Sequence, residues 1–174
     1  EAWEENGYLY SSSEYCENGN FAQWLKSRCI PLSKKEMYRI ILQMALAVKQ
    51  VHDSDIVHMD IKPNNFLVKA DNTIKLGDFG HAIDLSEIEV DKEEISSPNN
   101  SVQRVKNISE GDASYMAPEI LNFKAKITKK VDVFSLGLTL IEWFNKSGIE
   151  KLPLNGELWM KVRENEPSSF IKFP

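Results

Sequence analysis

The sequence predicts an α+β fold, because a long amphipathic helix, a short apolar hairpin and a buried apolar helix follow one another along the chain. The 174 residues fit one domain or part of one. Hydrophobic residues make up 42% and charged residues 27%, which is near the globular average and excludes a disordered tail or a fibrous repeat.

The N-terminal third contains a strand candidate and the clearest helix. Tyr8 to Tyr10 is an aromatic-rich strand candidate, and Phe21 to Arg28 is compatible with a short helix. Ser33 and Glu36 match a capping box, in which the two side chains satisfy free backbone amides at a helix start. Apolar residues then follow at helical spacing and form one stripe, made of Met37, Ile40, Ile41, Met44, Val48 and Val51.

Two short apolar runs in the middle of the chain predict a β-hairpin. Phe66 to Val68 and Ile74 to Leu76 are joined by a turn around Asp71, and Asp and Asn tolerate tight-turn geometry. With Asp71 near the turn, the register places Asn65 and Asp78 together at the open end of the hairpin.

The residues around this open end are suited to phosphate chemistry. A carboxylate and an amide oxygen side by side, here Asp78 and Asn65, are hard ligands suited to Mg²⁺ that carries substrate phosphates. Asp60 and Lys62 lie just upstream, and such a pair can orient a hydroxyl nucleophile and neutralise phosphate charge. Each pattern alone is more often a cap or a turn, but their joint occurrence around one hairpin favours a functional site.

The second half of the chain contains an acidic stretch and two helix candidates. Acidic residues dominate from Asp84 to Glu94, and a polar run without periodicity continues to Ser101, which predicts a mobile loop. Val131 to Phe144 is apolar on all sides and indicates a buried helix. It is shorter than the roughly 20 apolar residues that span a membrane. Glu157 to Arg163 is compatible with one more helix.

Charge and cysteine content exclude several classes of protein. The net charge of −5 argues against nucleic acid as a partner, since phosphate-backbone readers usually carry a basic excess. Cys16 and Cys29 are too few for a disulfide framework and lack metal-ligand spacing, so a reduced intracellular compartment is the default. We expect neither a nucleic-acid nor a membrane partner. Because the chain starts at Glu1 without an initiator Met, we expect it to be a fragment of a longer protein.

Four motifs resemble those of protein kinases. Residues 58–65, which read His-Met-Asp-Ile-Lys-Pro-Asn-Asn, resemble the catalytic loop, and residues 78–80, Asp-Phe-Gly, resemble the metal-binding triplet. Residues 117–119, Ala-Pro-Glu, resemble the end of the activation segment. Asp132 is similar to the anchoring Asp of the central helix.

This resemblance implies a protein-kinase-like fold that consists mostly of the helical C-lobe. Residues 1–13 would be the end of the N-lobe sheet, residues 14–20 the hinge, and residues 21–174 a C-lobe without its last helices. A kinase also needs a Gly-rich loop, a strand Lys and a helix Glu, and this chain has no segment that matches them. We therefore expect the chain alone to be inactive.

Departures from the general kinase pattern resemble the Wee family. Met59 stands where most kinases have Arg, His81 follows the Asp-Phe-Gly triplet, and residues 110–115 read Glu-Gly-Asp-Ala-Ser-Tyr. Residues 152–159 look like that family's segment after the central helix. Wee kinases restrain mitotic entry by phosphorylating a tyrosine of a cyclin-dependent kinase. Two residues, Phe79 and Pro118, are instead those of kinases in general, so a general serine/threonine kinase stays open as an alternative.

The resemblance also implies roles for nine residues. Asp60 would accept the substrate hydroxyl proton, Lys62 would steady the γ-phosphate of ATP, and Asn65 and Asp78 would hold Mg²⁺. The nucleotide contacts would be Glu14 and Cys16 through backbone groups to adenine, Ser13 as gatekeeper, Asn20 near the ribose and Leu67 beneath the adenine.

Less specific readings remain for several of these residues. Cys16 is equally a half-buried thiol at a strand end, and Asn20 is equally a turn residue. His58 is expected to be a packed structural residue, and His52 is expected to lie at a helix end.

The sequence thus predicts an ATP- and Mg²⁺-dependent protein kinase of the Wee type, with a cyclin-dependent kinase as its protein substrate. A catalytically inactive pseudokinase or scaffold is the second alternative. The presence of all four residues of the catalytic and metal sets argues against it. The family resemblance implies a nuclear location, with the cytoplasm as the alternative. Activation-loop phosphorylation should be unnecessary, because Met59 is neutral and cannot bind a phosphate.

Overall fold

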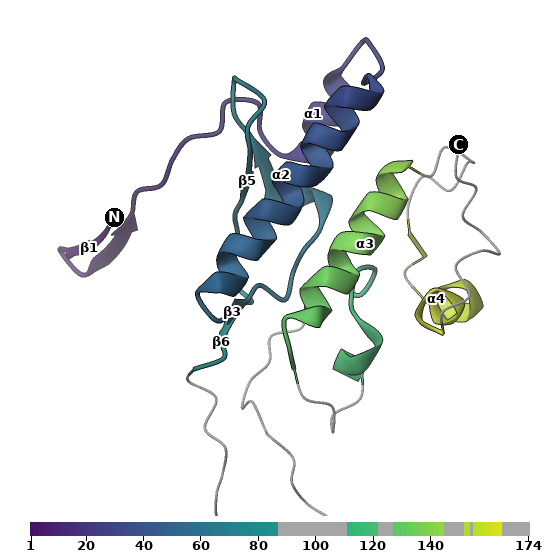
Figure 1. Cartoon of the computed structure of the whole chain (residues 1–174). Coiled ribbons are helices and arrows are strands. Elements are labelled where there is room, and N and C mark those ends of the chain that lie inside the picture. The colour runs from purple at the N-terminus through teal and green to yellow at the C-terminus, as the bar shows by residue number, and fades with distance from the viewer. Residues whose placement is uncertain (87–110, 122–126, 145–151, 154, 165–174) are drawn as a thin grey trace, which may run out of the picture.

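The structure, a computed structural model, describes residues 1–86, 111–121, 127–144, 152–153 and 155–164. The predicted mobile loop lies, from residue 87 onward, outside the described residues. Within the described ranges, four α-helices, two short 3-10 helices (Pro63–Asn65 and Pro118–Leu121) and three two-stranded antiparallel sheets are present (Figure 1). The α+β class predicted from the sequence is confirmed. In chain order the elements are β1 (Ala2–Glu5), β2 (Tyr8–Ser11), α1 (Phe21–Ser27), α2 (Lys34–Asp53), β3 (Ile56–Val57), β4 (Phe66–Val68), β5 (Ile74–Leu76), β6 (Ile83–Asp84), α3 (Lys130–Phe144) and α4 (Gly156–Arg163).

Helix α2 begins at the predicted capping box. The Ser33 backbone N–H donates to the Glu36 carboxylate at 2.8 Å, and the Glu36 N–H donates to the Ser33 hydroxyl at 3.3 Å. These bonds satisfy amides that the first helical turn leaves without an intrahelical partner. The apolar stripe then buries Ile40, Met44 and Val48 against the rest of the protein.

The main core lies among α1, α2 and the β4–β5 hairpin. Phe21, Met44 and Phe66, one from each of these parts, are at most 1% exposed. Helix α3 lies beside α2 in Figure 1 and packs against the same core through partly buried side chains, namely Leu136, Leu140 and Trp143. This packing holds the β4–β5 hairpin against the helices and so determines the position of the residues at its open end.

Helix α3 is buried on one side within the described part of the chain. Its buried residues are Val131, Asp132, Ser135, Leu138 and Thr139, whereas Val133 is 59% exposed. The predicted buried helix is confirmed for most of its length, since Val133 is the single exposed residue from Val131 to Phe144, and the fully buried residues lie on one face. Among the described residues, no helix has the length and apolar character needed to cross a bilayer.

The β1–β2 hairpin stands away from the helices in Figure 1. Trp3 faces Tyr10 across the ladder, and their rings stack with centroids 5.3 Å apart. Asn6 and Gly7 make the turn with φ of 53° and 75°. An Asn-Gly turn of this kind matches the right-handed twist of the two strands it joins.

Candidate active site

The β4–β5 hairpin has the register predicted from the sequence. Phe66 faces Leu76, and the next pairs follow in antiparallel order. One position further toward the open end, the Gly77 N–H donates to the Asn65 carbonyl at 2.9 Å. The hairpin therefore places Asn65 opposite Gly77, the residue that precedes Asp78.

Asp60 is a buried carboxylate that accepts three side-chain or backbone donors. It is 3% exposed, and its Oδ2 lies 2.8 Å from both Lys62 Nζ and Asn65 Nδ2. Its Oδ1 accepts the backbone N–H of Asp112 at 3.0 Å. Burial by itself raises the pKa of Asp60, but the bonds from Lys62, the Asp112 amide and Asn65 outweigh it and hold that pKa below its ordinary value. The carboxylate is therefore ionised at neutral pH.

The same bonds fix the orientation of the Asn65 amide. Its Nδ2 donates to the carbonyl of Asp60 at 2.7 Å as well as to the carboxylate, so its Oδ1 is directed away from Asp60. Asp78, one peptide beyond Gly77, is exposed and has a left-handed backbone with φ of 62°. An amide oxygen and a carboxylate are ligand types that suit a divalent cation that also binds phosphates. Within the described ranges, no group of three or more His, Cys, Asp or Glu side chains could hold a metal by itself.

Asp132 of α3 anchors the loop that carries Asp60. Its Oδ2 accepts the backbone N–H of His58 at 2.8 Å, and its Oδ1 accepts that of Met59 at 2.9 Å. The ring Nε2 of His52 lies 2.8 Å from Oδ2. Asp132 is 1% exposed, so these amides have a buried acceptor rather than water. The carboxylate thus ties the loop and the end of α2 to α3.

The two histidines near this loop have the structural places that the sequence predicted. His58 is fully buried, its Nε2 lies 3.0 Å from the Gly77 carbonyl, and its ring packs on Phe79 with centroids 4.9 Å apart. Burial lowers its pKa, which favours the neutral ring. His52 lies in the last turn of α2. Both predictions are confirmed.

A glycine that sequence reasoning did not select as a site residue lets residues 111–112 approach Asp60. A Cβ at Gly111 would lie 2.5 Å from the Met59 carbonyl and 2.9 Å from Asp60 Oδ1, closer than real Cβ atoms come. Only glycine fits there, and the next residue, Asp112, then reaches Asp60 with its amide. The Asp112 side chain accepts the N–H of Ser114 at 3.0 Å, a local hydrogen bond that fixes this part of the segment. The Glu-Gly-Asp motif was the available signal.

Three residues predicted to contact the nucleotide lie in one region. A turn runs from Cys16, whose carbonyl accepts the Gly19 N–H at 3.1 Å. The Gly19 carbonyl in turn accepts the Val68 N–H at 2.9 Å, and Asn20 forms a β-bridge with Leu67. Cys16, Asn20 and Leu67 are therefore held together beside β4.

The structure assigns local roles to two of these residues. Asn20 is the N-cap of α1, and its Oδ1 accepts the Gln23 N–H at 2.9 Å, so its side chain has a local structural role directly after the turn. Cys16 is a partly buried thiol, and burial raises its pKa, with the charges of Glu14 and Glu17 adding to the effect. Contacts of either residue with a nucleotide stay predictions.

Ser13 and Glu14 lie in the extended segment before this turn, and both are exposed. The Glu14 carboxylate forms ion pairs with Lys69 at 2.6 Å and Lys75 at 3.0 Å, and these bonds lower its pKa. Because both lysines belong to the hairpin region, these pairs connect the predicted hinge to it. These ion pairs involve only the carboxylate of Glu14 and not its backbone N–H or carbonyl.

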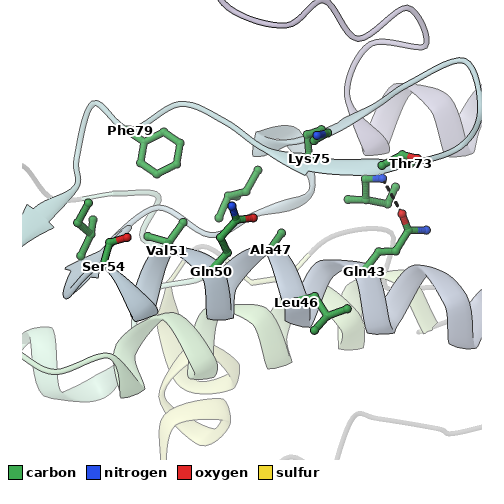
Figure 2. A pocket seen from close by; sticks show the side chains of 12 residues that line it. Gln43, Leu46, Ala47, Gln50, Val51, Ser54, Thr73, Lys75 and Phe79 are labelled. Carbon is green, nitrogen blue, oxygen red and sulfur yellow. Dashed lines mark hydrogen bonds between the residues drawn. The ribbon is translucent and has the colours of Figure 1, made fainter.

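A pocket of about 560 Å³ lies between α2 and β5 (Figure 2). Gln43 lines it and accepts the Ile74 N–H at 3.0 Å, and the ring of Phe79 lies at its other end. None of the nine predicted site residues lines this pocket. The predicted catalytic, metal and nucleotide residues are thus outside it.

The protein kinase domain family matches residues 1–165. The chain belongs to this family, and the protein-kinase-like fold is confirmed. Kinase domains in general use ATP and a divalent metal, in keeping with the donor set around Asp60 and Asn65.

Within the kinases, the chain is similar to members of the Wee type. It is 35% identical over 98% of its length to the membrane-associated tyrosine- and threonine-specific cdc2-inhibitory kinase wee-1.3 of Caenorhabditis elegans, and covers 22% of that protein. The identity is 32% over 97% with the mitosis inhibitor protein kinase wee1 of Schizosaccharomyces pombe, of which 17% is covered. It is 35% over 96% with the mitosis inhibitor protein kinase SWE1 of Saccharomyces cerevisiae, of which 19% is covered. The chain thus spans about a fifth of these curated relatives, and the predicted resemblance is confirmed.

Proposed function

We propose that the protein containing this chain transfers the γ-phosphoryl group of ATP to a tyrosine hydroxyl of a cyclin-dependent kinase and so restrains mitotic entry. The observation that carries the transferase part is the buried, ionised Asp60 with its donors on Lys62, Asn65 and Asp112. The substrate part is supported by the printed names of the relatives, which are mitosis inhibitors and cdc2-inhibitory kinases.

Asp60 has one acceptor position left for a substrate hydroxyl. An ionised carboxylate offers about four lone-pair sites. Lys62 and Asn65 occupy two on Oδ2, and the Asp112 amide occupies one on Oδ1. A hydroxyl bound at the remaining Oδ1 site would give its proton to Asp60 while its oxygen forms the new bond to phosphorus. The bond from phosphorus to the bridging oxygen breaks, and ADP leaves with that electron pair.

Lys62, Asn65 and Asp78 would serve the phosphates. Lys62 carries a positive charge beside Asp60 and would also steady the γ-phosphate. Asn65 Oδ1 and the Asp78 carboxylate would hold Mg²⁺, which neutralises phosphate charge when bound. The fixed Asn65 amide, with its nitrogen turned to Asp60, supports this assignment.

We place the adenosine part of ATP beside the turn of residues 16–20. Glu14 and Cys16 would bind adenine through backbone groups, with Ser13 as gatekeeper and Leu67 beneath the ring. Asn20 would approach the ribose through its Nδ2, since its Oδ1 caps α1. In this assignment residues 1–13 end the N-lobe, residues 14–20 form the hinge, and residues 21–174 belong to the C-lobe.

Phosphoamino-acid analysis separates the proposed tyrosine kinase from a general serine/threonine kinase. The full-length protein would be incubated with radiolabelled ATP and a cyclin-dependent kinase bound to its cyclin. We expect labelled phosphotyrosine, and the relative named as tyrosine- and threonine-specific favours phosphothreonine as a second product. Label on serine and threonine alone would favour the general kinase.

A pseudokinase or scaffold would bind without transferring phosphate. Thermal stabilisation of the full-length protein by ATP, measured with and without Mg²⁺, tests whether the nucleotide and metal sites work together. We expect a larger shift with Mg²⁺, and an Asp78→Asn variant should lose that difference.

The location is also a proposal. We place the protein in the nucleus on the strength of the Wee resemblance, and the cytoplasm is the alternative. Relatives from Caenorhabditis elegans and Drosophila melanogaster carry "membrane-associated" in their names. Imaging of the tagged full-length protein separates these locations, and a signal confined to internal membranes would contradict the proposal.

A further inference from the structure

Arg163 of α4 donates hydrogen bonds to the backbone of the activation segment. Its Nη2 lies 2.8 Å from the Ala113 carbonyl and 3.3 Å from that of Ser114, and its Nε lies 3.0 Å from that of Met116. Its Nη1 donates to Trp159 in its own helix at 3.1 Å. The planar guanidinium can make these bonds at once because its five N–H groups diverge in a fixed geometry.

Two further side chains complete this arrangement. The Trp159 Nε1 donates to the Ala113 carbonyl at 2.9 Å, and the Ser135 hydroxyl of α3 donates to the Tyr115 carbonyl at 2.7 Å. Four consecutive carbonyls, those of residues 113–116, are thus bound by side chains of α3 and α4. The Tyr115 hydroxyl also donates to Glu142 of α3, while burial raises its pKa. The helices, and not a sheet, determine the shape of this segment.

Arg163 is a charged side chain that is almost fully buried. It is 7% exposed, and its Cζ lies 3.6 Å from the centre of the Trp159 ring. Burial lowers its pKa to about 10, so it stays charged at neutral pH. Within the described residues it has no carboxylate as an ion-pair partner, and carbonyl dipoles take that place. A buried charge is costly unless it is well hydrogen-bonded, and here the carbonyls of residues 113, 114, 116 and 159 accept the bonds that keep Arg163 buried.

The segment that Arg163 holds also reaches the candidate base. Ala113 directly follows Asp112, whose amide donates to Asp60 Oδ1. Gly111 lies so close to Asp60 that it has no room for a side chain. The position of the Ala113 peptide therefore decides whether the Asp112 amide remains on the carboxylate.

We propose that Arg163 and Trp159 are positioning residues that hold residues 113–116 so that the Asp112 amide binds Asp60 Oδ1. This bond takes one lone pair of Oδ1 and directs the other toward the substrate hydroxyl. The inference rests on the proposed function, because it assigns Asp60 as the base. It adds α4, about 100 residues from Asp60 in sequence, to the parts that set up the reaction.

The test uses two conservative variants of the full-length protein and one matched control. Arg163→Lys keeps the charge but loses the fork, and Trp159→Phe keeps the ring but loses the indole donor. Lys161→Met also removes a cation from α4, but one whose 2.7 Å ion pair is with Glu157 on the helix surface. We expect kcat to fall about 10-fold or more in the first two variants, since small misplacements of reacting groups are costly. KM for ATP and all parameters of Lys161→Met should stay near those of the wild type.

A split between kcat and KM distinguishes positioning from mere stabilisation. A lost positioning contact should lower kcat of the folded protein while KM for ATP stays unchanged, whereas a merely structural contact should lower only the folded fraction and the thermal midpoint. Wild-type kcat in both variants, or a fall in kcat no larger than the fall in the folded fraction measured by circular dichroism, would overturn the inference. If Arg163→Lys does not fold, Trp159→Phe decides by the same criteria. Failure of the proposed function looks different, because the wild type itself would then show no transfer that depends on Asp60.

Discussion

Replacement of Asp132 by Ala should destabilise the protein severely. Asp132→Ala leaves the buried amides of His58 and Met59 without their acceptor. A buried amide without a partner costs about 1–3 kcal/mol, so the two together cost about 2–6 kcal/mol. Because whole domains are stable by only about 5–15 kcal/mol, this is a large part of the total.

Urea denaturation of the full-length protein, followed by circular dichroism, measures this loss as a shift of the midpoint. Asp132→Asn should lose about half as much, because an amide oxygen can still accept one of the two N–H groups. Asp53→Ala is the control, since Asp53 is 62% exposed and its pair with Lys49 is worth at most about 1 kcal/mol. An Asp132→Ala midpoint equal to that of Asp53→Ala would refute the proposed anchoring.

Three further predictions concern pH, regulation and the chain itself. Lys62→Met removes a hydrogen bond that lowers the pKa of Asp60, so the acidic limb of the pH–activity profile should move to higher pH. An unchanged acidic limb would contradict the assignment of Asp60 as the titrating base. The lowered pKa of Asp60 also makes the free energy of unfolding depend on pH. The ionised carboxylate stabilises the folded protein above the pKa that Asp60 has in the unfolded state, and this stabilisation is lost as the pH falls through the lower pKa of the folded state. Phosphatase treatment of the full-length protein should leave its kinase activity unchanged. Met59 cannot bind a loop phosphate, and hydrogen bonds from Asp112 and Arg163 hold the segment instead. A collapse of activity that follows phosphate loss between Ser86 and Tyr115 would contradict this prediction. The purified 174-residue chain should show no measurable transfer in a radiolabelled ATP assay, and robust turnover that Asp60→Asn abolishes would show that it contains all that catalysis needs.

Local sequence signals predicted most of the secondary structure. The capping box at Ser33 and Glu36 and the hairpin around Asp71 depend on residues a few positions apart, and both formed as predicted. The Asn6-Gly7 pair is an equally local hairpin signal, and it joins β1 to β2, the strand predicted over Tyr8 to Tyr10. Burial was harder to predict, as the exposed Val133 shows, because it depends on neighbours that the local pattern does not name.

The candidate site could be predicted only in part from the sequence. The register places Asn65 opposite Gly77, one residue before Asp78, and the side chain of Asn65 contacts Asp60. That contact depends on the shape of a loop rather than on a ladder. Arg163 was missed as a contributor because it meets its carbonyl partners about 50 residues away, and nothing in a helical pattern distinguishes such an arginine from a solvated one.

Asp60 is proposed here to be the base of a protein tyrosine kinase, and a comparison of the wild type with Asp60→Asn tests this claim. Full-length wild type and Asp60→Asn, both shown to be folded by circular dichroism, would be assayed for transfer of labelled phosphate from ATP to the tyrosine of a cyclin-dependent kinase. We predict transfer by the wild type and a rate at least about 100-fold lower for Asp60→Asn, in line with the contribution of general acid–base catalysis. Equal rates for the two proteins, or no transfer by the wild type, would contradict the claim.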